Sequence, residues 1–120
     1  MSAKLRIVPD SVSVALSSSG DLIAAPGDNR KIIVLGWVLT LDTDGDTFKF
    51  QSGASTDKTG AMSKGSAVMA PVPEPPKKPE TSQWGIFKCE ANEKLNVVMT
   101  GTGNLTGIVH YYIWPSVAPA

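Results

Sequence analysis

Residues 31–50 constrain the fold more than any other part of this chain. A long apolar run meets the acidic, glycine-bearing segment Asp42-Thr-Asp-Gly-Asp, and an alternating run of apolar and polar residues follows. This pattern predicts two β-strands joined by a tight turn, that is, a hairpin. Because side chains alternate between the two faces of a strand, the bulky residues of the first strand are expected to enter the core together: Ile33, Leu35, Trp37, Leu39 and Leu41.

The opposite face of that strand is smaller but still mostly apolar. It carries Ile32, Val34, Gly36, Val38 and Thr40, and residues 106–114 form a second strand that is apolar on both faces. In a two-layer sandwich, each sheet has an outer face in water. Apolar outer faces therefore predict burial against a second copy or another protein. The alternative is that a long loop covers this face within the monomer.

Turn residues divide the rest of the chain into further short strands. Residues 11–17 alternate strictly, which predicts a half-buried strand near a sheet edge. Strands are also expected within residues 22–25, 84–89 and 95–100. Long helical patterns are absent from the sequence. We therefore predict an all-β fold, an antiparallel, jelly-roll-like sandwich, as a single domain of 120 residues with its core in residues 11–114.

Residues 52–82 lack a clear strand pattern, apart from residues 67–70, which could form a brief strand. The run Pro71-Val-Pro-Glu-Pro-Pro-Lys-Lys-Pro must be extended and cannot lie in the interior of a sheet. A structureless stretch of this length is unusual inside a compact domain. Residues 54–83 are therefore expected to form one long Pro-rich loop, either an arm on a neighbouring subunit or a plain solvated loop.

Composition narrows the possible partners. The formal net charge is zero, charged residues make up 18% of the chain, and no Lys/Arg cluster stands out, so a nucleic-acid partner is not expected. The longest apolar run is too short to cross a bilayer, and no signal-peptide pattern follows the initial Met. We expect a chain made in the cytosol without a membrane partner. Cys89 is the single cysteine, which excludes an internal disulfide.

The sequence shows no arrangement of catalytic residues. His110, the single histidine, lies in an apolar strand, where packing or an interface is the better interpretation. Cys89 has no activating neighbours, and one Cys with one His is too few for a zinc site. The Asp42 segment resembles the start of a calcium loop, but Gly53 stands where such a loop has its final Glu. We predict no enzyme activity, no cofactor and no metal site.

Three segments together resemble a known class of protein. They read Arg30-Lys-Ile-Ile-Val-Leu-Gly-Trp-Val-Leu followed by Phe48-Lys-Phe-Gln-Ser-Gly; Trp84-Gly-Ile-Phe-Lys-Cys-Glu-Ala-Asn-Glu-Lys-Leu-Asn-Val; and Thr100-Gly-Thr-Gly-Asn-Leu-Thr-Gly-Ile-Val-His-Tyr. In that order they resemble small β-sandwich proteins encoded among the virion structural genes of tailed bacteriophages. The resemblance spans roughly residues 11–114 without the long loop. Asn92 stands where a turn glycine is expected, and Asn tolerates left-handed backbone better than most residues.

The resemblance implies a capsid decoration or cement protein. Such proteins sit as dimers or trimers on the outside of the icosahedral shell and bridge neighbouring major capsid subunits. The implied partners are the major capsid protein and further copies of this chain, and the implied location is the virion exterior. The residues expected on a self-association face are Ile32, Val34, Val38, Val109, Tyr111 and Ile113. The residues expected on a capsid-contacting arm are Val68, Met69, Pro71, Val72, Pro73, Pro75, Pro76, Lys77 and Lys78.

Two other functions stay open on the sequence. Exposed Trp84 and Trp114 with a nearby polar groove would favour a tail or fibre-tip module that binds a host surface glycan. An intact, mobile loop in a monomer would favour a cytosolic binding module that offers the Pro-rich segment as a peptide ligand.

Overall fold

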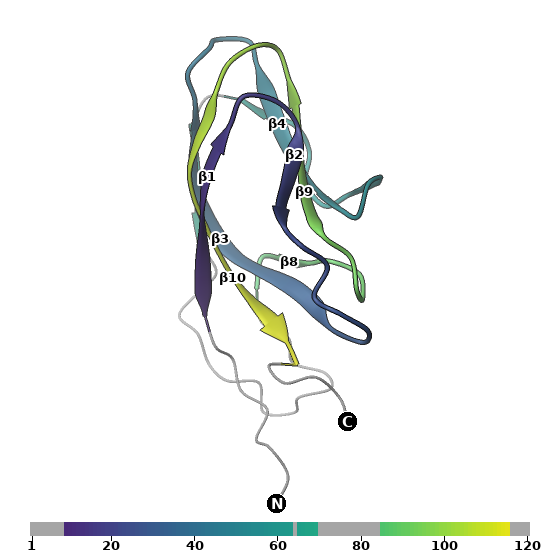
Figure 1. Cartoon of the computed structure of the whole chain (residues 1–120). Helices are drawn as coiled ribbons and strands as arrows, with labels where there is room; N and C mark the ends of the chain where they lie inside the picture. The colour runs from purple at the N-terminus through teal and green to yellow at the C-terminus, as the bar shows by residue number, and fades with distance from the viewer. Residues whose placement is uncertain (1–8, 64, 70–84, 116–120) are drawn as a thin grey trace, which may run out of the picture.

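Two antiparallel β-sheets face each other across the core (Figure 1). The computed structural model describes residues 9–63, 65–69 and 85–115. Sheet A contains, in spatial order, β1 (Asp10–Leu16), β10 (Leu105–Trp114), β3 (Lys31–Leu41) and β7 (Gly65–Met69), and β8 (Phe87–Lys88) also pairs with β3. Sheet B contains β2 (Gly20–Ile23), β9 (Leu95–Thr100), β4 (Thr47–Ser52) and β5 (Thr56–Asp57), and β6 (Met62–Ser63) also pairs with β4. The predicted all-β sandwich is confirmed.

The first strand of the chain lies beside the last. β1 pairs with β10 in sheet A, and β2 pairs with β9 in sheet B. The connections β1–β2, β3–β4 and β9–β10 each pass between the two sheets at the same end of the molecule (Figure 1). The jelly-roll-like arrangement remains a prediction, which this order supports because a jelly roll also winds paired strands around two sheets.

The connection at residues 42–46 is not a hairpin turn, so that prediction is wrong. β3 lies in sheet A and β4 in sheet B, and their ladders are made with other strands. The carboxylates of this connection instead accept hydrogen bonds from the loop between β9 and β10. Asn104 N donates to Asp42 Oδ1 at 2.7 Å, and Gly103 N donates to Asp46 Oδ2 at 2.6 Å. The acidic residues therefore hold two crossings together.

A β-bulge in β3 changes which side chains enter the core. Gly36 pairs with His110 and Val34 pairs with Tyr111, so Leu35 is an extra residue on β3. The residues of β3 that join the core between the sheets are Ile32, Val34, Trp37, Leu39 and Leu41. The predicted single core face is therefore wrong for Ile33 and Leu35, because strict alternation fails at an extra residue.

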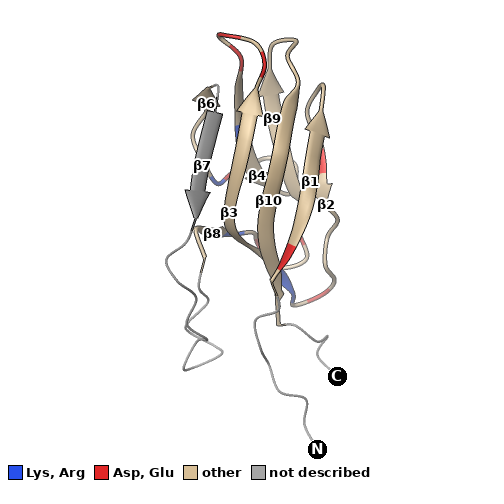
Figure 2. Cartoon of the chain, turned by 90° about the vertical axis from the view of Figure 1, so that its left-hand side faces the viewer, with Lys and Arg blue, Asp and Glu red and all other residues tan. Residues whose placement is uncertain are grey.

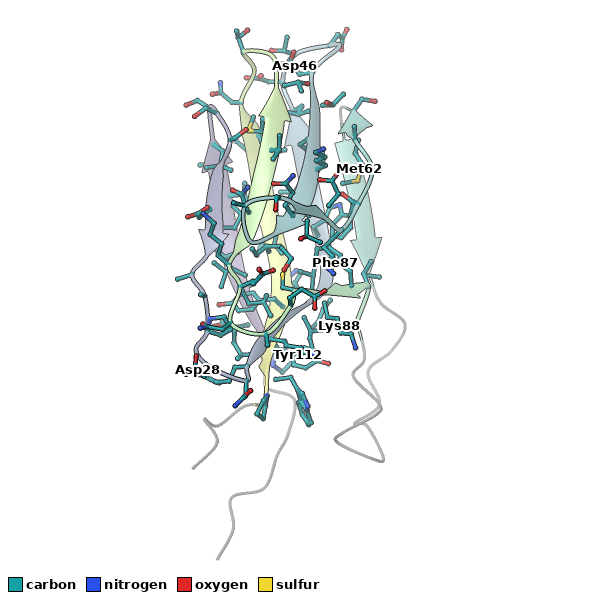
Figure 3. The ribbon with its side chains drawn as sticks, turned by 90° about the vertical axis from the view of Figure 1, so that its right-hand side faces the viewer. Asp28, Asp46, Met62, Phe87, Lys88 and Tyr112 are labelled. Carbon is teal, nitrogen blue, oxygen red and sulfur yellow. The ribbon has the colours of Figure 1, made fainter. Side chains whose placement is uncertain are left out.

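Sheet A is buried on both sides at one end. Between the sheets, Trp37 packs against Phe50 with ring centroids 4.8 Å apart. A second cluster, Ile33, Leu35, Tyr112 and Trp114, lies on the other side of sheet A, and each of its members is at most 5% exposed. Figure 3 labels Tyr112 at this end, far from Asp46. This double burial explains why β3 and β10 are apolar on both faces.

The segment predicted as one long loop is partly strand. β5, β6 and β7 fall within residues 54–83, and β7 pairs with the edge of β3 from Gly36 to Thr40. Val68 and Met69 therefore belong to a sheet and not to a free arm, because the unpaired edge of β3 offers them backbone partners. The remaining arm residues of the prediction, within residues 71–78, lie outside the described residues.

Candidate interaction surface

The residues predicted to form a self-association face do not share an exposed surface. Five of the six pack against the core between the sheets: Ile32, Val34, Val109, Tyr111 and Ile113. The first three have no exposed surface at all, so the prediction is wrong for them. Apolar side chains that face the second sheet are buried there and leave nothing for a partner. Val38, on the outer side, is 49% exposed.

The outer side of sheet A instead presents a continuous surface of neutral side chains, which we call the uncharged face. Strand alternation and register bring nine residues to it: Ser11, Ser13 and Ala15 from β1; Thr106, Ile108 and His110 from β10; Gly36, Val38 and Thr40 from β3. Figure 2 looks onto this side and shows β1, β10 and β3 without Lys, Arg, Asp or Glu through their middle.

The residues of the uncharged face lie side by side across three strands. Ser13, Ile108 and Val38 follow one another across three strands, and the hydroxyls of Thr40 and Thr106 lie 3.3 Å apart. Most of the nine side chains are small, and six of the nine residues are exposed. The centres of protein–protein interfaces are depleted of charge, whereas nucleic acid requires cations. The uncharged face shares this lack of charge with interface centres, and it lacks the cations that nucleic acid requires.

The outer side of sheet B is polar and its groups are paired with one another. Gln51 Nε2 donates to Asp57 Oδ1 at 2.8 Å, and Lys49 Nζ donates to Asp57 Oδ2 at 3.0 Å. These two hydrogen bonds hold the pKa of Asp57 below its usual range. Asn96 Nδ2 donates in turn to Gln51 Oε1 at 3.2 Å. The two outer sides of the sandwich thus differ in charge, so a partner can distinguish them.

An open groove of about 470 Å³ lies at one end of the uncharged face. Its polar groups bond to each other: Asn104 Nδ2 donates to Asp42 Oδ2 at 3.0 Å. Hydrogen bonds from the backbone and the side chain of Asn104 lower the pKa of Asp42. The groove therefore lies where the β1–β2, β3–β4 and β9–β10 connections meet. Its lining residues are Ala15, Leu16, Ser17, Asp42, Asn104 and Thr106.

Trp114 does not offer a surface on which a sugar could stack. It is 5% exposed and meets Tyr112 edge-on, with ring centroids 6.4 Å apart. It also stands at the end of β10, whereas the groove lies where β10 begins. Trp37 is in the core, and Trp84 lies outside the described residues. The exposed tryptophan that would favour glycan binding is therefore not found at Trp114.

Potential metal-ligating side chains do not cluster among the described residues. Within residues 9–63 and 85–115, no three His, Cys, Asp or Glu side chains lie close enough to hold a metal ion. Cys89 is buried in the core, and burial raises the pKa of its thiol to about 11. His110 lies on the uncharged face, on the other side of sheet A from that core. No helix that could span a lipid bilayer occurs in the part of the chain that the structure describes.

No family model, curated protein or solved structure matches this chain. Function is therefore inferred from the residues and geometry described above.

Sequence reasoning missed most of the uncharged face, because it searched for apolar side chains and the core takes these. The available signal was the Ser-Val-Ser-Val-Ala alternation of β1. The residues that alternate with the valines face solvent and are small and neutral. The solvent-facing side of a strand ordinarily carries charged residues.

Proposed function

We propose that this chain is a structural virion protein that decorates the outside of a tailed-bacteriophage capsid, bridges neighbouring major capsid subunits and stabilises the shell. The observation that carries the proposal is the uncharged face. A cement protein must lie against another folded protein, and an uncharged sheet surface suits that contact because interface centres are depleted of charge. The resemblance of three segments to small virion β-sandwich proteins supports the same function.

The chemical difference between the two sheets orients the protein on the shell. The uncharged face of sheet A meets the capsid, and the paired polar groups on the outer side of sheet B remain in water. A contact made of Ser, Thr, Val and Ile side chains is modest for one subunit, because little apolar area is buried. The same contact is repeated at many equivalent positions on the shell. When copies of the protein are linked to one another, these weak contacts together bind strongly. This role requires neither a catalytic group nor a cofactor.

The test uses phage heads that lack this protein, prepared from the phage that encodes it. Val38→Lys combined with Ile108→Lys places two charges in the centre of the uncharged face. Val98→Lys is the control for a charge added away from this face, because Val98 pairs with Lys49 on the outer side of sheet B. Each protein is mixed with heads, and the fraction that sediments with them is measured.

We expect the wild type and Val98→Lys to sediment with heads, and the double variant to bind at least about tenfold more weakly, since an unpaired charge is costly to bury. Circular dichroism checks that all three are folded. Equal binding by the folded double variant, or no binding by the wild type, contradicts the proposal.

A further inference from the structure

β1 is the longest edge strand that the structure describes. Its seven residues pair with β10 without a register shift, from Asp10↔Tyr111 to Leu16↔Leu105. In the described strand order, β10 lies on one side of β1 and no strand lies on the other (Figure 2). Neighbouring residues of an antiparallel strand direct their N–H and C=O groups to opposite sides. About half of the backbone groups of β1 therefore point away from sheet A.

The edge of β1 lacks the features that usually prevent strand pairing. Its residues after Asp10 read Ser-Val-Ser-Val-Ala-Leu, with no charge, no proline and no bulge. The β2 edge of sheet B is different. β2 has four residues, its register shifts between Asp21 and Ile23, and Asp21 forms an ion pair with Lys94 at 3.0 Å. The β2 edge is thus protected, whereas the β1 edge is suited to receive a strand.

We propose that β1 pairs in antiparallel fashion with β1 of a second copy, so that the two A sheets become one continuous sheet. A two-fold axis at Ser13 places Val12 opposite Val14 of the second copy, and Ser11 opposite Ala15. Apolar side chains then meet on the core side, and small neutral side chains meet on the outer side. In this register, side chains that face the core lie beside side chains of the second copy that also face the core. A shift by one residue would place them beside side chains that face outward.

Charge favours this pairing over a parallel one. Asp10 is the single charged residue of β1, and its Oδ2 accepts a hydrogen bond from Tyr111 Oη at 3.3 Å. Parallel pairing would bring the two Asp10 carboxylates together. Antiparallel pairing separates them by about 20 Å, because about six residue steps of roughly 3.3 Å each separate the paired ends. The two uncharged faces join without a charge at the seam, and the two-fold geometry gives a dimer and not a trimer.

A charge exchange at the proposed axis tests this pairing with the isolated full chain, independently of the capsid proposal. Ser13→Lys and Ser13→Glu each place like charges directly across the axis, about 5 Å apart at Cβ, where they repel. Val38→Lys is the matched control, because it adds a charge to the same face two strands from the edge. Light scattering over a concentration series gives the mass of each protein alone and of an equal mixture of Ser13→Lys with Ser13→Glu.

We expect a dimer for the wild type and for Val38→Lys, at least about tenfold weaker association for each Ser13 variant, and restored association in the mixture. A monomeric wild type overturns the proposal. So does a Ser13→Lys variant that dimerises like the wild type. Weakening by Val38→Lys as large as that by Ser13→Lys also overturns it, because the contact would then lie on the face and not at the edge.

Discussion

Asp46 shows how one side chain joins two crossings of the sandwich. It is 8% exposed, and its Oδ2 accepts the hydrogen bond from Gly103 N. The neighbouring Gly101 has a φ of 90°, and a Cβ there would overlap the Asp46 carboxylate. The acidic connection and the glycine-bearing loop are therefore complementary in shape and in hydrogen bonding.

We predict that Asp46→Ala lowers the free energy of unfolding by about 2 kcal/mol, because it leaves the buried N–H of Gly103 without an acceptor. Asp46→Asn keeps an acceptor oxygen of the same shape and should cost less than half as much. Urea denaturation of both variants measures the difference. Equal stabilities for the Ala and Asn variants would assign the effect to something other than this hydrogen bond.

At the scale of elements, β3 decides how sheet A is packed. Ile32 and Val34 face sheet B on one side of the bulge, and Trp37, Leu39 and Leu41 face it on the other. Leu35 is 4% exposed and belongs to the cluster on the opposite side with Tyr112. The extra residue thus adds a second side chain of β3, beside Ile33, to that cluster.

Two changes at Leu35 separate its packing from the bulge. Leu35→Ala removes buried methyl groups and is expected to cost about 2–5 kcal/mol. Deleting Leu35 removes the same methyl groups together with the bulge, but Val34 stays opposite Tyr111 and Gly36 stays opposite His110, so residues 31–34 keep their inner and outer side chains. We therefore expect the deletion variant to unfold cooperatively, with a loss of stability similar to that of Leu35→Ala. Urea denaturation monitored by tryptophan fluorescence compares the two. A deletion variant without a cooperative transition would show that the register depends on the extra residue.

Local features of the strands were predictable, and their pairing was not. The bounds of β3 and β9 follow from apolar patterns limited by turn residues, and Asn92 has the expected left-handed backbone, with a φ of 54°. The bulge was not predictable, because β3 is apolar in either phase. The crossing at residues 42–46 was mistaken for a hairpin, because five polar residues suit either connection. The uncharged face required the register of β1, β10 and β3, which a local pattern does not contain.

At the scale of the whole molecule, each end of the sandwich is held by polar contacts between connections that are distant in the sequence. Figure 3 labels Asp46 at one end and Asp28 at the other. At the second end, Asn92 Nδ2 donates to Asp28 Oδ1 at 3.1 Å, and Gly27 N donates to Asn92 Oδ1 at 3.0 Å. The carboxylates at these ends and along sheet B make the stability of the molecule depend on pH.

Acid should reduce the stability through groups whose pKa is lowered in the folded state. Asp42 is one, through the hydrogen bonds from Asn104; Asp57 is another, through those from Gln51 and Lys49; and Glu90 is a third, through the hydrogen bond from Lys58. A carboxyl group of this kind stabilises the fold above its unfolded pKa, near 3.8 for Asp and 4.5 for Glu. That contribution is lost as the pH falls through the lower folded value.

Alkali should reduce the stability for the opposite reason, and Cys89 supplies the clearest part of this prediction. Burial raises the pKa of its thiol from 9.0 to about 11, so the unfolded chain releases this proton first. The contribution is complete below pH 9 and disappears as the pH rises toward 11, with a slope of at most about 1.4 kcal/mol per pH unit. The measurement is the free energy of unfolding in urea from about pH 7 to 11, for the wild type and Cys89→Ala.

The Ala variant should lose stability less steeply between pH 9 and 11, whatever its stability at neutral pH. A remaining slope at the highest pH is expected from Tyr111, whose pKa is raised by partial burial and by Asp10. Identical alkaline slopes for the two proteins would show that the thiol is not held protonated by the fold. The core around Cys89 would then admit water, in conflict with the 1% exposure of that residue.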